Sequence, residues 1–112
     1  CGPCQSAGNY TESIQTEFAS EGVQYVTVLI DGYTPGTAPE TYEIDGWVNS
    51  HNINTASILQ GSREKMIDIA GISGYSIGGF PTYIYIGRDM KFYAGHVGFS
   101  EEYIKEKIQE GL

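Results

Sequence analysis

Cysteine and basic residues are scarce in this chain, and long apolar runs are absent. Its 112 residues include two cysteines, at positions 1 and 4, so the multi-bridge framework of small secreted domains is impossible. Six basic against fourteen acidic residues give a formal charge of −8, and no basic cluster interrupts that balance. We therefore expect no nucleic-acid partner. No apolar run approaches the ~20 residues that cross a bilayer, so we also expect no membrane span.

The composition is that of a globular protein. The chain is 40% hydrophobic and 12% aromatic, which separates it from disordered segments. Its length suits one domain, 1–112, that buries roughly two thirds of the surface of its unfolded form.

The first half of the chain predicts two helices and a strand. Residues 2–20 are expected to be helical, because Pro3 suits a first turn and apolar residues then recur at helical steps before Gly22. Residues 23–30 are rich in β-branched side chains, which predicts a strand covered on both faces in a parallel sheet. A loop at 33–39 leads to a second helix. The residues expected on one face of that helix are Ile44, Trp47, Val48 and His51.

The second half predicts a strand, a helix, a hairpin and a last helix. The strand is expected at 56–59, followed by a helix that Ser62 caps and Gly71 ends. Two β runs, 82–86 and 90–94, flank a tight turn and predict an antiparallel hairpin. Ser100 is expected to cap the last helix, with acidic residues suited to the helix dipole in its first turn. The helix after Ser62 carries the apolar residues Met66, Ile69 and Ala70. On the last helix, the residues expected to be buried are Ile104, Ile108 and Leu112.

The two cysteines lie at the start of the first predicted helix. A Cys-x-x-Cys pair on one helical turn brings both sulfurs close enough to bridge. Unpaired N–H groups and the helix dipole stabilise a thiolate there, so Cys1 is the predicted nucleophile and Cys4 the resolving thiol. Such a pair can exchange disulfides with a partner through a mixed disulfide.

The same cysteines also suit a structural bridge or a metal site. Zinc needs four ligands, or three with an open position, and the other soft candidates are His51 and His96. Their spacing resembles no compact zinc finger or ribbon. A module that binds or delivers soft copper or zinc through Cys1, Cys4 and His96 remains the alternative function.

Two motifs resemble those of a known superfamily. Cys1-Gly2-Pro3-Cys4 before a helix is the active-site sequence of thioredoxin, and Gly79-Phe80-Pro81-Thr82 before a β run resembles the cis-proline loop of that superfamily. The region from Trp47 and His51 to 75–82 is similar to the TlpA/ResA-type branch, extracytoplasmic thiol–disulfide oxidoreductases of bacteria. The resemblance covers essentially the whole chain.

The resemblance implies a fold and a site. The fold would be a three-layer α/β/α arrangement with a mixed sheet that includes the C-terminal antiparallel hairpin. Pro81 would be cis, lie beside the cysteine pair and present the backbone of Phe80 to a substrate, with Gly2 and Pro3 also contacting that substrate. Relatives place a buried central strand before the first cysteine. No residue precedes Cys1 here, so we expect that strand to be missing from this chain.

Asp31 is a candidate general base. ResA-type relatives carry a carboxylate just after the strand that follows the cysteine helix, which is near Asp31. Desolvation beside a buried sulfur would raise the pKa of this carboxyl group towards a useful value. The alternative is that Asp31 is only a turn residue that ends the strand.

Together these residues predict a thiol–disulfide oxidoreductase with catalytic residues Cys1, Cys4 and Asp31. Its expected partners are protein thiols or disulfides and an upstream redox protein, with no cofactor beyond its own cysteines and no metal. Gly2-Pro3 resembles the reducing members of the superfamily, which favours a reductase. A thiol peroxidase would need Thr and Arg partners around its cysteine, a setting that we do not find. The resemblance further implies an extracytoplasmic location.

Overall fold

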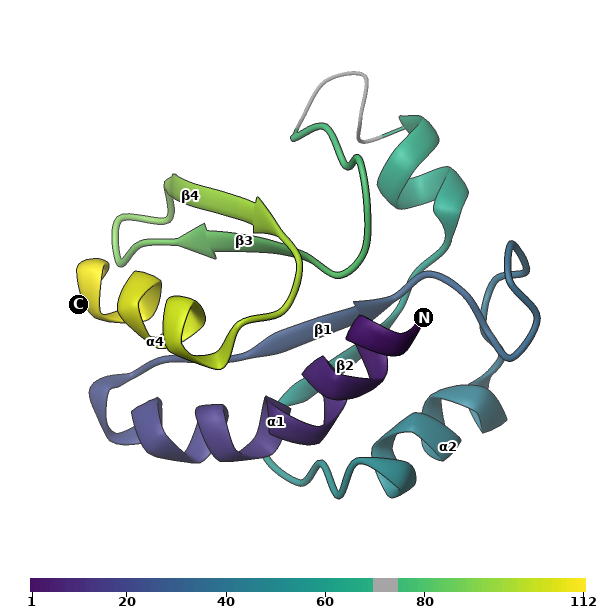
Figure 1. The fold of residues 1–112 in the computed structure, drawn as a ribbon, viewed down its shortest axis with the longest axis horizontal. Coiled ribbons are helices and arrows are strands. Elements are labelled where there is room, and N and C mark those ends of the chain that lie inside the picture. The colour runs from purple at the N-terminus through teal and green to yellow at the C-terminus, as the bar shows by residue number, and fades with distance from the viewer. Residues whose placement is uncertain (70–74) are drawn as a thin grey trace. The chain divides into compact units, whose positions relative to one another are not determined.

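Two short β-sheets and several helices make up the computed structural model, which describes residues 1–69 and 75–112 (Figure 1). Cys1–Tyr10 and Gly78–Leu112 form one unit, here called the hairpin unit, and Thr11–Ile77 form the other, the parallel-sheet unit. Helix α1, Gly2–Phe18, belongs to the hairpin unit up to Tyr10 and to the parallel-sheet unit beyond it. That residues 1–112 form a single domain stays a prediction.

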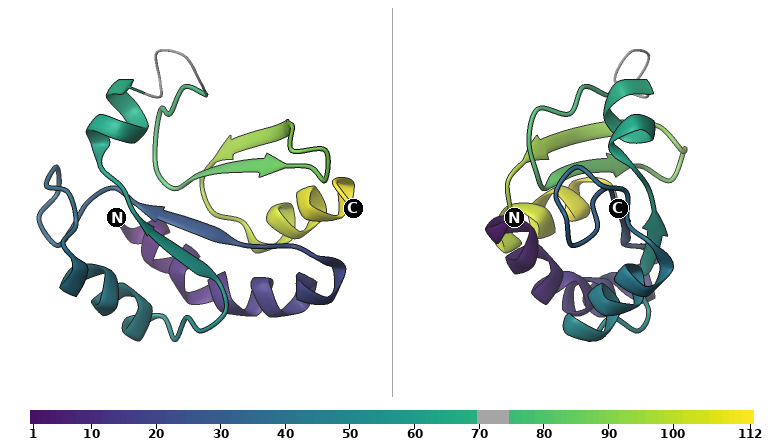
Figure 2. Two further views of the ribbon diagram at one scale, coloured as in Figure 1. Left: turned by 180° about the vertical axis from the view of Figure 1, so that it is seen from behind. Right: turned by 90° about the vertical axis from the view of Figure 1, so that its right-hand side faces the viewer.

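The parallel-sheet unit is built on strands β1 (Val26–Leu29) and β2 (Ser57–Gln60). Helix α2, Thr41–Ser50, connects them, and it lies on the same side of the two strands as the second part of α1 (Figures 1 and 2). The prediction that the first strand is covered on both faces is wrong, because Val26 is 47% exposed. The other three residues of β1 are half-buried, so no residue of this strand is fully covered.

β1 is also shorter than the predicted strand at 23–30, and Gln15 gives the reason. Its side-chain amide donates to the carbonyl oxygen of Val23 at 3.0 Å and accepts from the N–H of Tyr25. These backbone groups are therefore bonded to a buried helix side chain, and regular pairing begins only at Val26.

The other predicted elements of this unit are present with changed ends. A 3₁₀ turn, η1 (Ala19–Glu21), follows α1, and Gly22 then adopts a φ of 83°, which a glycine accepts readily. The helix expected after Ser62 is a π-helix, η2 (Glu64–Ile69), and the Ser62 hydroxyl accepts from the Lys65 N–H at 3.1 Å. Ala70 and Gly71, which were expected to complete it, lie outside the described residues.

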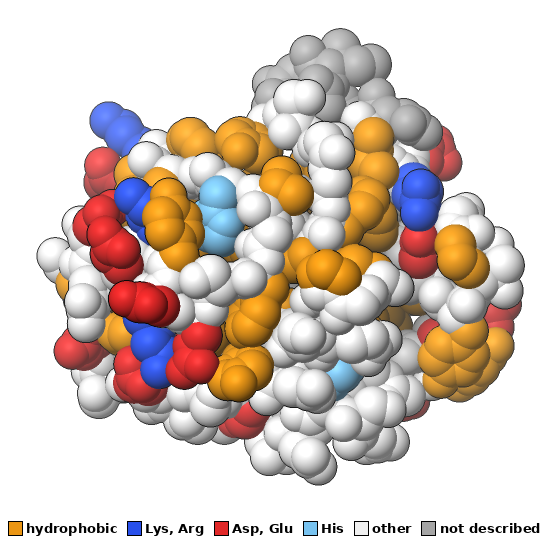
Figure 3. Space-filling view, viewed as in Figure 1, with side chains coloured by type: hydrophobic (Ala, Val, Ile, Leu, Met, Phe, Trp, Pro, Cys, Tyr) orange, Lys and Arg blue, Asp and Glu red, His pale blue; other side chains and the backbone are white. Residues whose placement is uncertain are grey.

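The hairpin unit contains the predicted antiparallel pair, β3 (Thr82–Ile86) and β4 (Phe92–Val97). Helix α4, Glu101–Glu110, follows, and the Ser100 hydroxyl caps it by accepting from the Tyr103 N–H. Ile104 and Ile108 are buried as predicted, but Leu112 is 47% exposed because α4 ends before it. Acidic and basic side chains alternate on the outer surface of α4 (Figure 3), where ion pairs join residues three and four apart.

The expected single mixed sheet is not what the structure contains. β1 pairs with β2 and β3 pairs with β4, and no ladder between described residues joins the two pairs. The chain is thus a mixed α/β protein with a C-terminal hairpin, but with two separate sheets. None of the helices in the described part of the chain is long and apolar enough to cross a membrane.

Candidate functional site

A disulfide joins Cys1 and Cys4 at the start of α1, with 5.2 Å between their Cα atoms. The carbonyl oxygen of Cys1 accepts the helical hydrogen bond from Gln5, and its Sγ lies 3.2 Å from the donating N–H of Cys4. Cys1 therefore occupies the N-cap position, with sulfur where a serine or aspartate would place oxygen. A negative charge on this sulfur would face an N–H group and the positive end of the helix dipole.

The residues between the cysteines leave the pair open to solvent. Cys1, Gly2 and Pro3 are exposed, and Cys4 is half-buried. Cys1, the predicted nucleophile, is therefore the more exposed residue of the pair. An external thiolate can reach it, and in a dithiol state its sulfur could attack an external disulfide.

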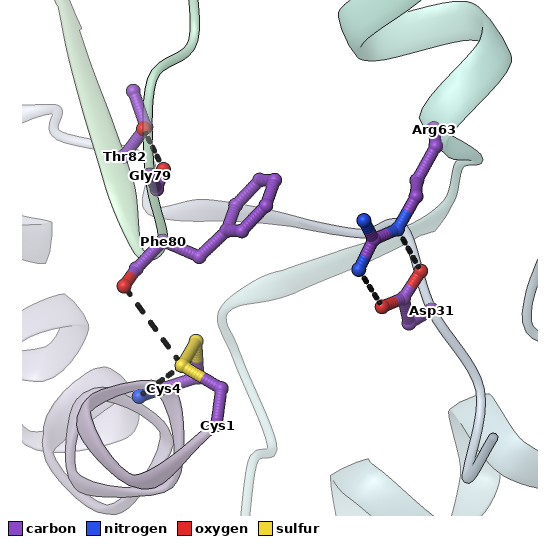
Figure 4. The surroundings of a disulfide bond; sticks show 7 residues. All are labelled: Cys1, Cys4, Asp31, Arg63, Gly79, Phe80 and Thr82. Carbon is purple, nitrogen blue, oxygen red and sulfur yellow. Dashed lines mark hydrogen bonds and ion pairs between the residues drawn. A yellow bond between two sulfur atoms is a disulfide. The ribbon is translucent and has the colours of Figure 1, made fainter. Parts of the chain in front are cut away.

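A loop of the hairpin unit meets this sulfur. The Phe80–Pro81 peptide bond is cis, and the Phe80 carbonyl oxygen lies 3.8 Å from Cys1 Sγ (Figure 4). These two residues are 79 positions apart in the chain. The structure thus brings together the cysteine pair and the Phe80–Pro81 loop, as the resemblance implied.

Two hydrogen bonds fix this loop on either side of Phe80. The Thr82 hydroxyl donates to the Gly79 carbonyl oxygen at 2.6 Å, and the Gly98 N–H donates to the Pro81 carbonyl oxygen at 2.8 Å. Sequence reasoning missed both Thr82 and Gly98 as part of the site. Thr82 could have been found from its position directly after Pro81. No feature of the sequence around Gly98 indicates that it contacts this loop.

Asp31, the candidate base, pairs with Arg63. Two guanidinium nitrogens donate to its carboxylate oxygens at 2.9 and 2.7 Å (Figure 4). These hydrogen bonds outweigh the effect of burial and hold the pKa of Asp31 below its usual value of 3.8. The prediction of a raised pKa is therefore wrong. The sequence did not show that an arginine 32 residues away would pair with this carboxylate.

His96, which the metal hypothesis used, lies in an aromatic cluster of the hairpin unit. Its Nε2 is 2.7 Å from the Tyr85 hydroxyl, and its ring stacks on Tyr83 and meets the edge of Tyr103. Burial lowers the pKa of His96, which favours the neutral imidazole. Within residues 1–69 and 75–112, no three His, Cys, Asp or Glu side chains lie close enough to hold a metal together.

Comparison with known proteins identifies the fold. No family model matches the chain, and no curated protein matches it. A solved structure described as a "putative Thiol:disulfide interchange protein DsbE from Chlorobium tepidum" is similar, with a TM-score of 0.76 and 21% sequence identity. The match covers 99% of this chain and 72% of that chain. It confirms, at the level of fold, the predicted resemblance to thioredoxin-like proteins.

Proposed function

We propose that this chain is a thiol–disulfide oxidoreductase that exchanges disulfides with protein substrates through Cys1 and Cys4. The observation that carries the proposal is an exposed Cys1 at the start of a helix, whose sulfur is bridged to Cys4 and faces the Phe80 carbonyl of the Phe80–Pro81 loop. The name of the structurally similar protein agrees with this chemistry. As the resemblance of Gly2-Pro3 to reducing relatives suggests, we propose that the chain acts as a reductase.

The proposed reaction starts from the dithiol form. The Cys1 thiolate attacks one sulfur of a substrate disulfide, forming a mixed disulfide and releasing a substrate thiolate, which takes up a proton. Cys4 then loses its proton and attacks Cys1 Sγ, which releases the second substrate thiol and closes the Cys1–Cys4 bridge. Two electrons pass from the protein dithiol to the substrate disulfide, and an upstream redox protein returns two electrons by the reverse steps.

Substrate contact is proposed for residues beside the sulfur. Gly2 and Pro3 are exposed between the cysteines, and Phe80 and Pro81 form the facing loop. A substrate segment that lies across these four residues would bring its own disulfide to Cys1. By the same resemblance, we propose an extracytoplasmic location, where disulfide-containing substrates are common.

For Asp31 we propose the role of proton acceptor from Cys4. Its carboxylate is ionised at neutral pH and so can accept a proton, but its pairing with Arg63 makes it a weaker base than the sequence suggested. An Asp31→Asn variant tests the role, because loss of a base would slow turnover and change its pH profile. An unchanged profile would leave Asp31 as a structural partner of Arg63.

Insulin reduction with dithiothreitol as electron donor tests the proposal. Wild type should accelerate the reaction, while Cys1→Ser, Cys4→Ser and the double variant should not turn over. In a separate reaction without dithiothreitol, which would cleave it, reduced Cys4→Ser should form a mixed disulfide with insulin that mass spectrometry detects and that Cys1→Ser lacks. Absence of turnover by wild type, together with stoichiometric copper or zinc retained through chelation, would contradict exchange and favour the metal-binding alternative.

A further inference from the structure

Three successive carbonyl groups of the loop at 79–81 point to three different partners. That of Gly79 accepts from the Thr82 hydroxyl, and that of Pro81 accepts from the Gly98 N–H. The carbonyl between them, of Phe80, lies beside Cys1 Sγ (Figure 4). The direction of the Phe80 carbonyl is thus set by hydrogen bonds on both sides of it.

We propose that Thr82 is a positioning residue for the exchange reaction, whose hydroxyl closes the turn at Gly79 and so holds the Phe80 carbonyl oxygen beside the Cys1 sulfur. This inference rests on the proposed function and adds a residue to it. Thr82 does not contact the reacting sulfur itself. It acts through the backbone of the loop.

The two polar groups beside Cys1 Sγ have opposite effects on its chemistry. The Cys4 N–H, at 3.2 Å, is a donor and stabilises a thiolate, which is the nucleophilic form. The Phe80 carbonyl, at 3.8 Å, is an acceptor, so in the dithiol state it can accept from S–H and stabilise the thiol. The reactivity of Cys1 therefore depends on how firmly the loop holds that carbonyl in place.

The two segments that meet at Cys1 carry no charged side chain; the charges that act near it are those of the Cys1 amino group and of Asp31, which attract each other. Residues 1–10 and 78–82 contain no Asp, Glu, Lys, Arg or His. The Phe80 carbonyl is the acceptor beside the sulfur, so a displacement of that carbonyl changes the local field of the sulfur. The hydrogen bond from Thr82 is short, at 2.6 Å, and partly buried, so water replaces it poorly.

The test compares Thr82→Val with Thr82→Ser. Valine keeps the shape and the β preference required at the first residue of β3 but removes the donor, whereas serine keeps the donor. Thr16→Val is the matched control, because the Thr16 hydroxyl also donates to a backbone carbonyl, that of Glu12, on the exposed surface of α1. Each variant is made in wild type and in Cys4→Ser, and circular dichroism establishes that it is folded.

The readout is the pKa of Cys1 in the Cys4→Ser background, from the pH dependence of its alkylation by iodoacetamide. Thr82→Val should lower this pKa by about half a unit, roughly a threefold rise in the ratio of thiolate to thiol, because a weak S–H···O contact is lost. Thr82→Ser and Thr16→Val should retain the value of the parent. If Thr82→Val does not fold, Thr82→Ala is measured in its place with the same expectation.

Two results would overturn the inference: a parental pKa in folded Thr82→Val, or an equal shift in Thr82→Ser, which would show that the hydroxyl is not the cause. Alkylation needs no protein substrate, so this outcome is separate from that of insulin reduction. A chain that fails to reduce insulin but shows the Thr82-dependent shift would contradict the proposed function alone.

Discussion

The carboxylate of Glu12, on α1, is predicted to make a large electrostatic contribution to the stability of the fold. Its carboxylate accepts from the backbone N–H groups of Asn54, Thr55 and Ala56 at 2.9 to 3.1 Å, and from the Thr55 hydroxyl. Burial alone would raise the pKa of Glu12, but these hydrogen bonds lower it from 4.5 to about 2. The side chain thereby fastens α1 to the segment that leads into β2.

The expected magnitude follows from this pKa. Converted in full, the change from 4.5 to about 2 corresponds to roughly 3 kcal/mol at about 1.4 kcal/mol per pKa unit. Solvent still reaches the carboxylate and screens it, so we expect Glu12→Gln to lower the free energy of unfolding by about 1–2 kcal/mol at pH 7. Because folding lowers the pKa, this contribution is fully present above pH 4.5 and disappears as pH falls through about 2.

Urea unfolding, followed by circular dichroism between pH 7 and pH 2, measures this difference. Glu106→Gln is the control, because it removes the same charge from an exposed side chain of α4. The Glu12→Gln deficit should exceed that of the control at pH 7 and shrink towards zero near pH 2. A deficit that equals the control at pH 7, or that does not change with pH, would refute the assignment of these hydrogen bonds.

Three further predictions concern single contacts. Arg63→Met should raise the pKa of Asp31 towards its usual range, as NMR titration would show, because it removes the two hydrogen bonds that lower this pKa. An unchanged pKa would contradict the pairing. Gly98→Ala should lower the free energy of unfolding, measured with urea, by about 1–3 kcal/mol, because a φ of 98° is strained for any residue but glycine. Gly78→Ala is the control, since a Cβ there meets no atom within 4 Å. Equal losses in the two variants would contradict the explanation by φ. Reduction of the disulfide should cost at most about 2 kcal/mol, and unfolding on reduction would contradict that limit.

Elements with strong local signals were predictable from the sequence. β3 occupies the predicted residues 82–86, and Ser100 caps α4 through its hydroxyl, because strand alternation and helix capping depend on neighbours in the chain. The same holds for the cysteine pair, whose place at a helix start follows from Pro3 and the apolar spacing after it.

What the sequence could not predict depends on side chains that bond to distant backbone. Gln15 and Glu12 look like ordinary polar helix residues in the sequence, yet one sets where β1 begins and the other holds the segment before β2. The lowered pKa of Asp31 was likewise not predictable from the sequence, because the main cause is Arg63 and not a neighbour in the chain. The contact between Cys1 and Phe80 was accessible only through the motif resemblance, since spacing alone says nothing about residues 79 positions apart.

The length of the loop that the bridge closes bears on what the cysteines are for. Cys1 and Cys4 are three positions apart, so the bridge restricts the unfolded chain little, by about 2 kcal/mol against about 3 for a 15-residue loop. The first turn of α1 is also fastened without it, by the hydrogen bond from Gln5 to the Cys1 carbonyl. A bridge that joined distant segments would stabilise the fold more, because it would restrict the unfolded chain more strongly. A bond whose removal costs little, at the exposed residue Cys1, can open and close while the rest of the protein remains folded, as repeated exchange requires.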